Sequence, residues 1–203
     1  MERLIAEGLD HFGISYAPAA AEKISFYMHE LERWNRRVNL TAKRPAESIV
    51  RELLYDAFFL CSLVKGPSSA LDMGSGSGIL AIPIAILDER MQLFSVDRTL
   101  RKIQFQRHIK RGLQLSNLSA IHGRIEDLEP LGVDALLTKG FGTAKSILEK
   151  GGRHLREGGT AYLLKGRAER GGLYPGFFLE RVLEYHLPGS PKEYQLFVYK
   201  KVS

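Results

Sequence analysis

The stretch that decides the fold is Leu71-Asp72-Met73-Gly74-Ser75-Gly76-Ser77-Gly78, where three alternating glycines follow a short apolar run. Glycine reaches positive φ angles and lets a ligand approach the backbone, so the pattern predicts a binding loop between a strand and the next helix. The loop reads G-x-G-x-G, with isoleucine at position 79, and therefore does not match the dinucleotide fingerprint G-x-G-x-x-G. The chain also lacks G-x-x-x-x-G-K-[ST], which excludes a P-loop.

Outward from this loop, short apolar runs alternate with helical stretches. Strands are expected over 70–73, 92–97, 118–121, 134–137 and 160–164, with helices over 79–87, 99–113 and 144–155. This order predicts an α/β fold with a mostly parallel, doubly wound sheet. Two further strands, 182–187 and 194–199, are joined by only six residues, too few for a parallel crossover, so this pair must be antiparallel. By fold analogy the arrangement is that of the Rossmann-like methyltransferases.

The first 66 residues read as helical. Apolar residues at spacings of three and four predict a helix over 19–38, and a second helix is expected over 46–64; the stripe of the first is Ile24, Tyr27, Leu31, Trp34 and Val38. On this stripe Trp34 is expected in the core rather than as a stacking platform for bases. Gly66-Pro67-Ser68-Ser69 marks a boundary. We therefore predict an N-terminal helical extension over 1–66 and an α/β domain over 67–203.

Composition limits the class of protein. The 29 Lys and Arg residues against 23 Asp and Glu residues give a net charge of +6, which permits a polyanionic partner without requiring one. The single cysteine, Cys61, excludes an intrachain disulfide framework and a multi-cysteine zinc site. The longest apolar run, 79–87, is shorter than the ~20 residues of a membrane span. We expect a cytoplasmic monomer that binds neither metal nor membrane.

Two carboxylates indicate the ligand of the loop. Asp72 would repel a pyrophosphate but suits the ammonium and sulfonium groups of S-adenosylmethionine; alternatively, it only accepts hydrogen bonds from loop amides. Asp97 ends the second expected strand, 19 residues after Gly78, where an acid accepts hydrogen bonds from ribose hydroxyls. The alternative for Asp97 is a cap of the following helix. Together they predict S-adenosylmethionine as the cofactor.

Two further positions border the expected site. After the third strand, Ile125 is expected to pack on the adenine and Glu126 to hydrogen-bond nearby, with a solvated turn as the alternative. Lys139 ends the fourth strand, beside the expected position of methyl transfer, where it could pair with the cofactor carboxylate or an RNA phosphate. We take Lys139 as the candidate catalytic residue; the alternative is a surface lysine.

Over roughly residues 20–170 the chain resembles the bacterial small-subunit ribosomal RNA guanine-N7 methyltransferases, the glucose-inhibited division protein B family. The resemblance is carried by Trp34-Asn35, Val38-Asn39-Leu40-Thr41, Val50-Arg51, Leu53-Leu54 with Asp56, the loop 71–78, Ile82-Pro83, Asp97, Gly123-Arg124-Ile125-Glu126-Asp127-Leu128 and Lys165-Gly166. It implies that Gly74, Ile79, Ile125 and Glu126 contact the cofactor. The candidate cofactor residues are then Asp72, Gly74, Ser75, Gly76, Gly78, Ile79, Asp97, Ile125, Glu126 and Lys139.

The chain departs from the family pattern around the site. Lys139 stands where the family has arginine, Arg98 where it has serine, and Ser77 where it has proline. Glu52 and Ala57 replace the histidine and serine that flank the aspartate of the second helix. Three functions therefore stay open: methylation of guanine N7 in 16S ribosomal RNA, methylation of another RNA or a small molecule, and cofactor and RNA binding without catalysis.

The residues fit an acceptor that needs no base, because guanine N7 carries a lone pair and no hydrogen. Transfer then depends mainly on alignment. A C5-pyrimidine methyltransferase needs a thiolate, but Cys61 lies in an apolar helical stretch. Amino-group methyltransferases commonly carry Asn/Asp-Pro-Pro-aromatic after the fourth strand, and Thr138-Lys139-Gly140-Phe141 is not such a tetrad.

Two basic clusters are candidates for an RNA surface. Between Arg98 and Arg111 six cations follow one another without an intervening acid, and a second cluster lies in the N-terminal helices. Cations of this kind bind phosphates without reading sequence. The alternative is a solvated helix face. The candidate RNA-binding residues are Arg36, Arg37, Arg98, Arg101, Lys102 and Arg107, and the expected partner is ribosomal RNA or the small ribosomal subunit.

Overall fold

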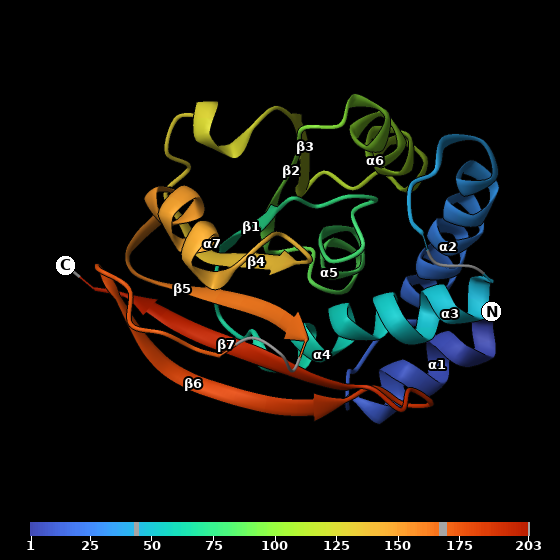
Figure 1. Ribbon diagram of the computed structural model, residues 1–203. Helices are drawn as coiled ribbons and strands as arrows, with labels where there is room; N and C mark the ends of the chain where they lie inside the picture. The colour runs from blue at the N-terminus through green and yellow to red at the C-terminus, as the bar shows by residue number, and fades with distance from the viewer. Residues whose placement is uncertain (43–44, 167–169, 203) are drawn as a thin grey trace.

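A seven-stranded sheet forms the centre of the computed structural model, which describes residues 1–42, 45–166 and 170–202 (Figure 1). The strand order is β3-β2-β1-β4-β5-β7-β6. The strands are β1 (Ser69–Met73), β2 (Gln92–Asp97), β3 (Leu118–His122), β4 (Val133–Lys139), β5 (Leu155–Gly166), β6 (Phe177–His186) and β7 (Glu193–Lys201). The first five pair in parallel, whereas β7 is antiparallel to both β5 and β6. The expected parallel sheet and its antiparallel end are confirmed.

The strand order reverses between β1 and β4, which pair with each other at the middle of the sheet. The chain runs from β1 outward to β3, and then returns to β4 and proceeds to the other side. Loops that follow β1 and β4 therefore diverge at their carboxyl ends, and a crevice opens between them. This reversal positions the site described below.

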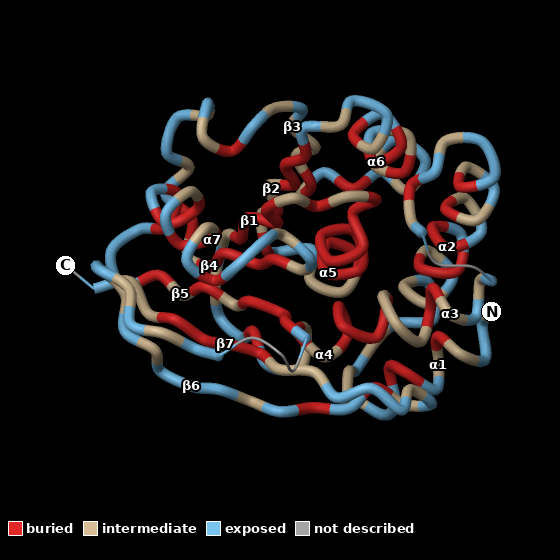
Figure 2. The backbone as a smooth tube through the Cα atoms, viewed as in Figure 1, coloured by how far each residue is buried: buried red, intermediate tan, exposed pale blue. Residues whose placement is uncertain are grey.

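Successive residues along the central strands serve two separate cores. Ala70, Leu137 and Leu164 belong to the core beneath the N-terminal helices, α5 (Ala81–Leu87) and α6 (Leu100–Leu113). Their chain neighbours Leu71, Leu136 and Leu163 belong to the core beneath α7 (Ala144–Gly151). This is the two-residue alternation of a strand that is buried on both faces. Figure 2 shows the same strands buried and β6 largely exposed at the edge of the sheet.

The N-terminal part comprises α1 (Glu2–His11), α2 (Pro18–Val38), α3 (Ala46–Ile49), a π-helical turn (Val50–Leu54) and α4 (Tyr55–Leu63). The helix expected over 46–64 is thus present, but a π turn interrupts it. Helix α2 ends at Val38, the next residue Asn39 has a φ of 52°, and the Asn35 side chain accepts a hydrogen bond from the Thr41 amide at 2.9 Å. These contacts explain why asparagines stand at 35 and 39.

The helix expected over 144–155 is shorter than the sequence suggested. Helix α7 ends at Gly151, a 3-10 turn covers Gly152–His154, and Leu155 already begins β5. The prediction of a helix to residue 155 was wrong because Leu155 already has an extended backbone, with φ −78° and ψ 137°, and pairs with Val133 of β4. In the part of the chain that is described, no helix is long and apolar enough to cross a membrane.

Candidate functional site

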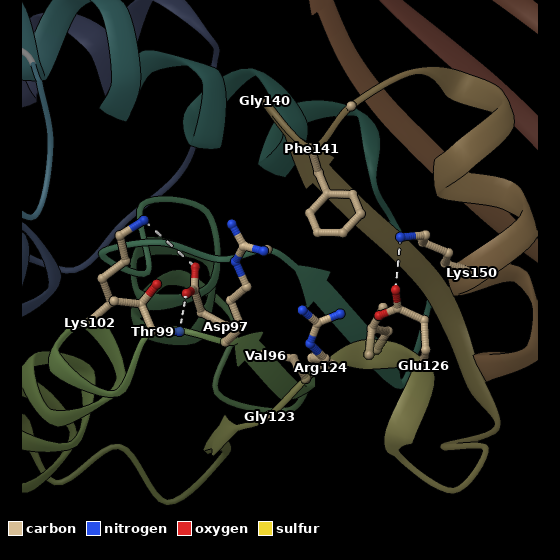
Figure 3. A pocket seen from close by; sticks show the side chains of 14 residues that line it. Val96, Asp97, Thr99, Lys102, Gly123, Arg124, Glu126, Gly140, Phe141 and Lys150 are labelled. Carbon is tan, nitrogen blue, oxygen red and sulfur yellow. Dashed lines mark hydrogen bonds and ion pairs between the residues drawn. The ribbon is translucent and has the colours of Figure 1, made fainter.

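A cavity of about 460 Å³ lies at the carboxyl ends of the parallel strands (Figure 3). Its walls come from the loops after β1, β2, β3 and β4 and from helices α6 and α7. The lining residues are Gly74, Val96, Asp97, Arg98, Thr99, Lys102, Gly123, Arg124, Ile125, Glu126, Gly140, Phe141, Gly142 and Lys150. The volume falls within the ~300–1,000 Å³ typical of small-molecule sites.

The glycine loop adopts a backbone that side chains rarely allow. Gly74, Gly76 and Gly78 have φ angles of 71°, 61° and 80°. The amides of Gly74 and Ser75 donate to the carbonyl of Val96 at 2.9 and 3.0 Å, which ties the loop to β2. A Cβ on Gly74 would lie 2.3 Å from Phe141 Cδ2. Glycine is therefore required at this position for two reasons, the positive φ angle and the closeness of the Phe141 ring.

Gln106 of α6, which the sequence analysis did not identify, holds the glycine loop in place by hydrogen bonds. Its buried amide group donates to Ser75 Oγ at 2.8 Å and to the Gly76 carbonyl at 2.9 Å, and its oxygen accepts from Ser95 Oγ at 2.5 Å. A polar side chain at a core position of α6 was the available signal. Buried amides of this kind stabilise only when each polar atom is paired, as here.

Asp97 lines the cavity and also organises its surroundings. Oδ2 accepts from the Gly76 amide at 2.9 Å and Oδ1 accepts from the Thr99 amide at 2.7 Å, while Lys102 Nζ lies 3.9 Å from Oδ2. Each carboxylate oxygen can accept a second hydrogen bond. Asp97 can therefore bind hydroxyls in the cavity while it holds the start of α6, and the two roles expected as alternatives are compatible.

Asp72 does not reach the cavity. It is buried, and Oδ2 accepts from the Ala81 amide at 3.2 Å. Burial, more than the neighbouring Asp97 charge, raises its pKa to about 7. The prediction that Asp72 faces the cofactor ammonium is therefore not supported, and the alternative of a loop-amide acceptor describes what is seen. Ser75, Gly76, Gly78 and Ile79 likewise build the loop without being among the residues described as lining the cavity.

Ile125 and Glu126 both line the cavity, as the sequence led us to expect. The Ile125 carbonyl accepts from Nε2 of the buried His154 at 3.0 Å, which fixes this loop from the α7 side. Glu126 Oε1 lies 2.8 Å from Lys150 Nζ, and the hydrogen bond from that lysine lowers the pKa of Glu126. Figure 3 shows this ion pair at the wall opposite Asp97.

Lys139 points away from the cavity. Its Nζ donates to the Glu52 carbonyl at 2.6 Å and pairs with the carboxylate of Asp56, both in the N-terminal helices. Among the described residues it does not line the cavity, although Gly140, Phe141 and Gly142 do. The structure therefore does not place Lys139 as a contact for the cofactor or the reacting atoms, because a buried carboxylate already holds its charge.

Phe141, noted in the sequence only as part of an absent tetrad, lines the cavity in the loop that follows Lys139. Its ring points into the cavity over Gly74 (Figure 3). Gly140 and Gly142 on either side have φ angles of 71° and 64°, so the loop turns sharply at both ends. Lys165 Nζ of β5 donates to the Gly142 carbonyl, and Thr138 Oγ1 donates to the Met73 carbonyl at 3.1 Å.

Comparison with known proteins agrees with this geometry. Residues 20–173 match the family described as rRNA small subunit methyltransferase G. The chain belongs to this family. It is 35% identical over 199 residues to the ribosomal RNA small subunit methyltransferase G of Geobacter sulfurreducens, covering 93% of this chain and 92% of that protein. The enzyme of the same name from Syntrophotalea carbinolica is 30% identical over 213 residues, covering 99% and 98%.

Solved structures show the same fold at low identity. M. jannaschii TYW2, crystallised in complex with AdoMet, superimposes with a TM-score of 0.57 at 15% identity, over 73% of this chain and 74% of that one. The chain is accordingly an S-adenosylmethionine-dependent methyltransferase with a Rossmann-like fold.

For a methyltransferase of this family, the cations around the cavity are of interest as RNA contacts. Arg98, Lys102, Arg124 and Lys150 line the cavity itself.

Trp34 of α2 packs on Phe105 and His108 of α6 at ring distances of 5.5 and 5.2 Å, which confirms its expected place against the core.

Helices α2 and α6 run antiparallel. Gly112 lies near Phe26, and His108 Nε2 lies 2.6 Å from Glu30 Oε2, whereas Phe105 packs on Trp34 further along α2. The C-terminal end of α2, with exposed Arg36 and Arg37, is therefore directed toward the start of α6 and the cavity. Arg98 and Arg101 are exposed there, and Arg107 is exposed while its Nε donates to the Ala120 carbonyl at 3.1 Å.

Proposed function

We propose that this chain transfers the methyl group of S-adenosylmethionine to N7 of a guanine in small-subunit (16S) ribosomal RNA. The observation that carries the proposal is the meeting of Gly74, Asp97 and Phe141 in one cavity, in a chain of the small-subunit methyltransferase family. The glycine and the carboxylate provide a cofactor site. The aromatic ring provides a wall on which a flat base can lie.

The residues of the cavity fit S-adenosylmethionine. Asp97 has acceptor capacity left for ribose hydroxyls, and Ile125 offers an apolar surface beside it for the adenine. At Gly74 the backbone is bare, which leaves room for the methionine part to pass close to it. When bound, the cofactor supplies an electrophilic methyl group on its sulfonium.

The chain needs no general base for this reaction, because N7 presents a lone pair. Its residues would only orient the guanine so that N7, and no other atom of the base, faces the methyl group. Such orientation can lower the activation barrier by several kcal/mol. No cysteine is among the described residues that line the cavity, and burial raises the pKa of Cys61 to about 12 at a distant position. This supports a base-free acceptor over a C5-pyrimidine acceptor.

N7 methylation also leaves a positive charge on the guanine. The face of an aromatic ring attracts a cation by about 0.5–2 kcal/mol, and Phe141 is the aromatic residue that borders the cavity among the described ones. An attraction that grows as the charge develops lowers the barrier, whereas equal attraction to substrate would not. Phe141 thus fits the chemistry better than Lys139.

For RNA binding we propose the surface formed by Arg36, Arg37, Arg98, Arg101, Lys102 and Arg107 beside the cavity. Residues 1–66 would act as a helical extension of a methyltransferase domain at 67–203, since Tyr27 of α2 donates to the Ser77 carbonyl of the glycine loop at 3.3 Å. We further propose that the chain works as a cytoplasmic monomer and without a metal ion.

Mapping of ribosomal RNA by mass spectrometry tests the function. RNA from cells that lack the gene should miss one methyl group on a small-subunit guanine, and the gene should restore it. A gene variant with Asp97→Ala should not. Unchanged 16S RNA with a loss of methylation in another RNA would identify a different substrate. No loss in any RNA would indicate a silent binding protein or a small-molecule substrate.

A further inference from the structure

An ion pair with a buried carboxylate lies at the start of the loop that carries Phe141. The carboxylate of Asp56 in α4 is inaccessible to solvent, pairs with Lys139 Nζ through Oδ2 and accepts from Tyr185 Oη at 2.6 Å through Oδ1. Tyr185 of β6 in turn stacks on Phe59 of α4 at a ring distance of 4.0 Å. Three segments far apart in the sequence meet at this carboxylate.

The π-helical turn supplies the second partner of Lys139. In the turn Val50–Leu54 the hydrogen bonds span five residues instead of four, a local geometry that frequently marks functional sites. The Glu52 carbonyl of this turn accepts from Lys139 Nζ at 2.6 Å. The lysine is thus held by one carboxylate and one carbonyl, both from the N-terminal helices.

Stability alone does not explain such a pair. Desolvation of two charges costs about as much as their attraction returns, and apolar residues of similar volume commonly do as well or better. What the pair adds is a fixed position for Lys139. Lys139 is the last residue of β4, and Gly140, which follows it with a φ of 71°, begins the loop that places Phe141 against Gly74.

We propose that Asp56 is a positioning residue for methyl transfer: by holding Lys139, it fixes the start of the Gly140–Gly142 loop and thereby the Phe141 ring in the cavity. Lys165 holds the other end of the loop at the Gly142 carbonyl. The loop is therefore anchored on both sides. The role in methyl transfer rests on the proposed function, whereas the order of the loop does not.

Asp56→Asn tests the proposal, because it keeps the shape of the side chain and removes its charge. We expect kcat for methyl transfer to fall about 10-fold or more, while the dissociation constant of S-adenosylmethionine changes less than about threefold. The nuclear Overhauser contact between the Phe141 ring and the Gly74 α protons should weaken, and contacts within α6 should not. Lys139→Arg should retain most of kcat, since it retains the charge.

A second variant separates positioning from stability. Asp56→Leu with Lys139→Met and Tyr185→Phe replaces the pair and the hydroxyl that donates to it by apolar side chains, which should restore the melting temperature but neither kcat nor the Phe141–Gly74 contact. The matched control is Lys192→Gln, which removes the Lys192–Glu52 pair of 2.6 Å at the neighbouring surface and should leave both readouts unchanged.

A wild-type contact between the Phe141 ring and Gly74 in Asp56→Asn, or a kcat that falls only with the folded fraction, would overturn the proposal. If the wild-type chain fails to methylate ribosomal RNA, the proposed function is refuted, and the contact between Phe141 and Gly74 still decides whether Asp56 orders the loop.

Discussion

We expect cofactor binding to depend most directly on Asp97, which lines the cavity. We expect Asp97→Ala to weaken S-adenosylmethionine binding about 10-fold or more, because hydrogen bonds to a charged acceptor are each worth about 1.5–3 kcal/mol. The Gly76 and Thr99 amides also lose their acceptor, so the melting temperature should fall as well. Calorimetric titration measures the affinity, with exposed Asp10→Ala as the control. An unchanged dissociation constant would remove Asp97 from the site.

At the same scale, Asp72 should make the stability of the protein depend on pH. Its pKa is about 7 in the folded chain, against about 3.9 in an unfolded one. A raised carboxyl pKa means that its contribution to stability is complete below pH ~4 and is lost as pH rises through about 7, at up to about 1.4 kcal/mol per pH unit.

Asp72→Asn removes this titration and still offers an oxygen to the Ala81 amide. We therefore expect the stability of Asp72→Asn relative to wild type to increase between pH 4 and pH 7 and to level off above pH ~7. Urea unfolding of both proteins across this range measures the difference, in which the other titrating groups cancel. Parallel stability curves would show that Asp72 does not bind the proton.

At the scale of the element, substitutions in the glycine loop can separate the cost of backbone strain from the cost of a steric contact. Gly74 and Gly76 have similar positive φ angles, but only a Cβ on Gly74 meets a neighbour, Phe141 Cδ2. Gly76→Ala should therefore lose only about 1–2 kcal/mol of stability to strain. Gly74→Ala should lose more and should also displace the Phe141 ring.

Thermal unfolding and S-adenosylmethionine titration of Gly74→Ala, Gly76→Ala and the double variant Gly74→Ala with Phe141→Ala compare the two effects. The double variant should recover part of the stability that Gly74→Ala loses. Equal losses in the two single variants, with no recovery in the double, would mean that the contact with Phe141 is unimportant.

The ends of α2 and α6 carry the second element-scale prediction. Arg37 and Arg101 are exposed and do not line the cavity, so Arg37→Gln with Arg101→Gln should weaken RNA binding and leave cofactor affinity intact. If each arginine contacts one phosphate, the log–log salt slope should flatten by about 1.4 to 1.8 in total.

Arg90→Gln with Arg181→Gln is the matched control, because both residues are exposed, on the turn before β2 and on edge strand β6. RNA affinity is measured at several salt concentrations for both doubles. Coincident slopes for the two doubles would place the RNA on another face.

For the whole molecule, the sequence pattern was sufficient to predict the sheet, but it predicted only part of the site. The alternation of Leu136 with Leu137 and the six-residue connection before β7 follow from short-range geometry, so they were predictable. Asp97, Ile125 and Glu126 were also predictable as lining residues, because Asp97 ends a parallel strand and the other two lie in the loop after one. All three must therefore lie at one edge of the sheet.

Lys139 and Asp72 show where this reasoning stops. Both stand beside the correct loops, but the direction of a side chain depends on partners distant in sequence: Asp56 turns Lys139 away from the cavity, and burial under α5 encloses Asp72. Gln106 was missed for the same reason, since its contacts with Ser75 and Ser95 exist only after folding.

Methyl transfer to isolated small ribosomal subunits tests the central claim most directly. The purified chain is incubated with S-adenosylmethionine labelled in its methyl group and with subunits from cells that lack the gene, and the RNA is digested to nucleosides. We expect the label in N7-methylguanosine of the small-subunit RNA, at about one methyl group per subunit, and none when Asp97→Ala replaces the wild type. No incorporation by the wild-type chain, or label in any nucleoside other than N7-methylguanosine, would contradict the account.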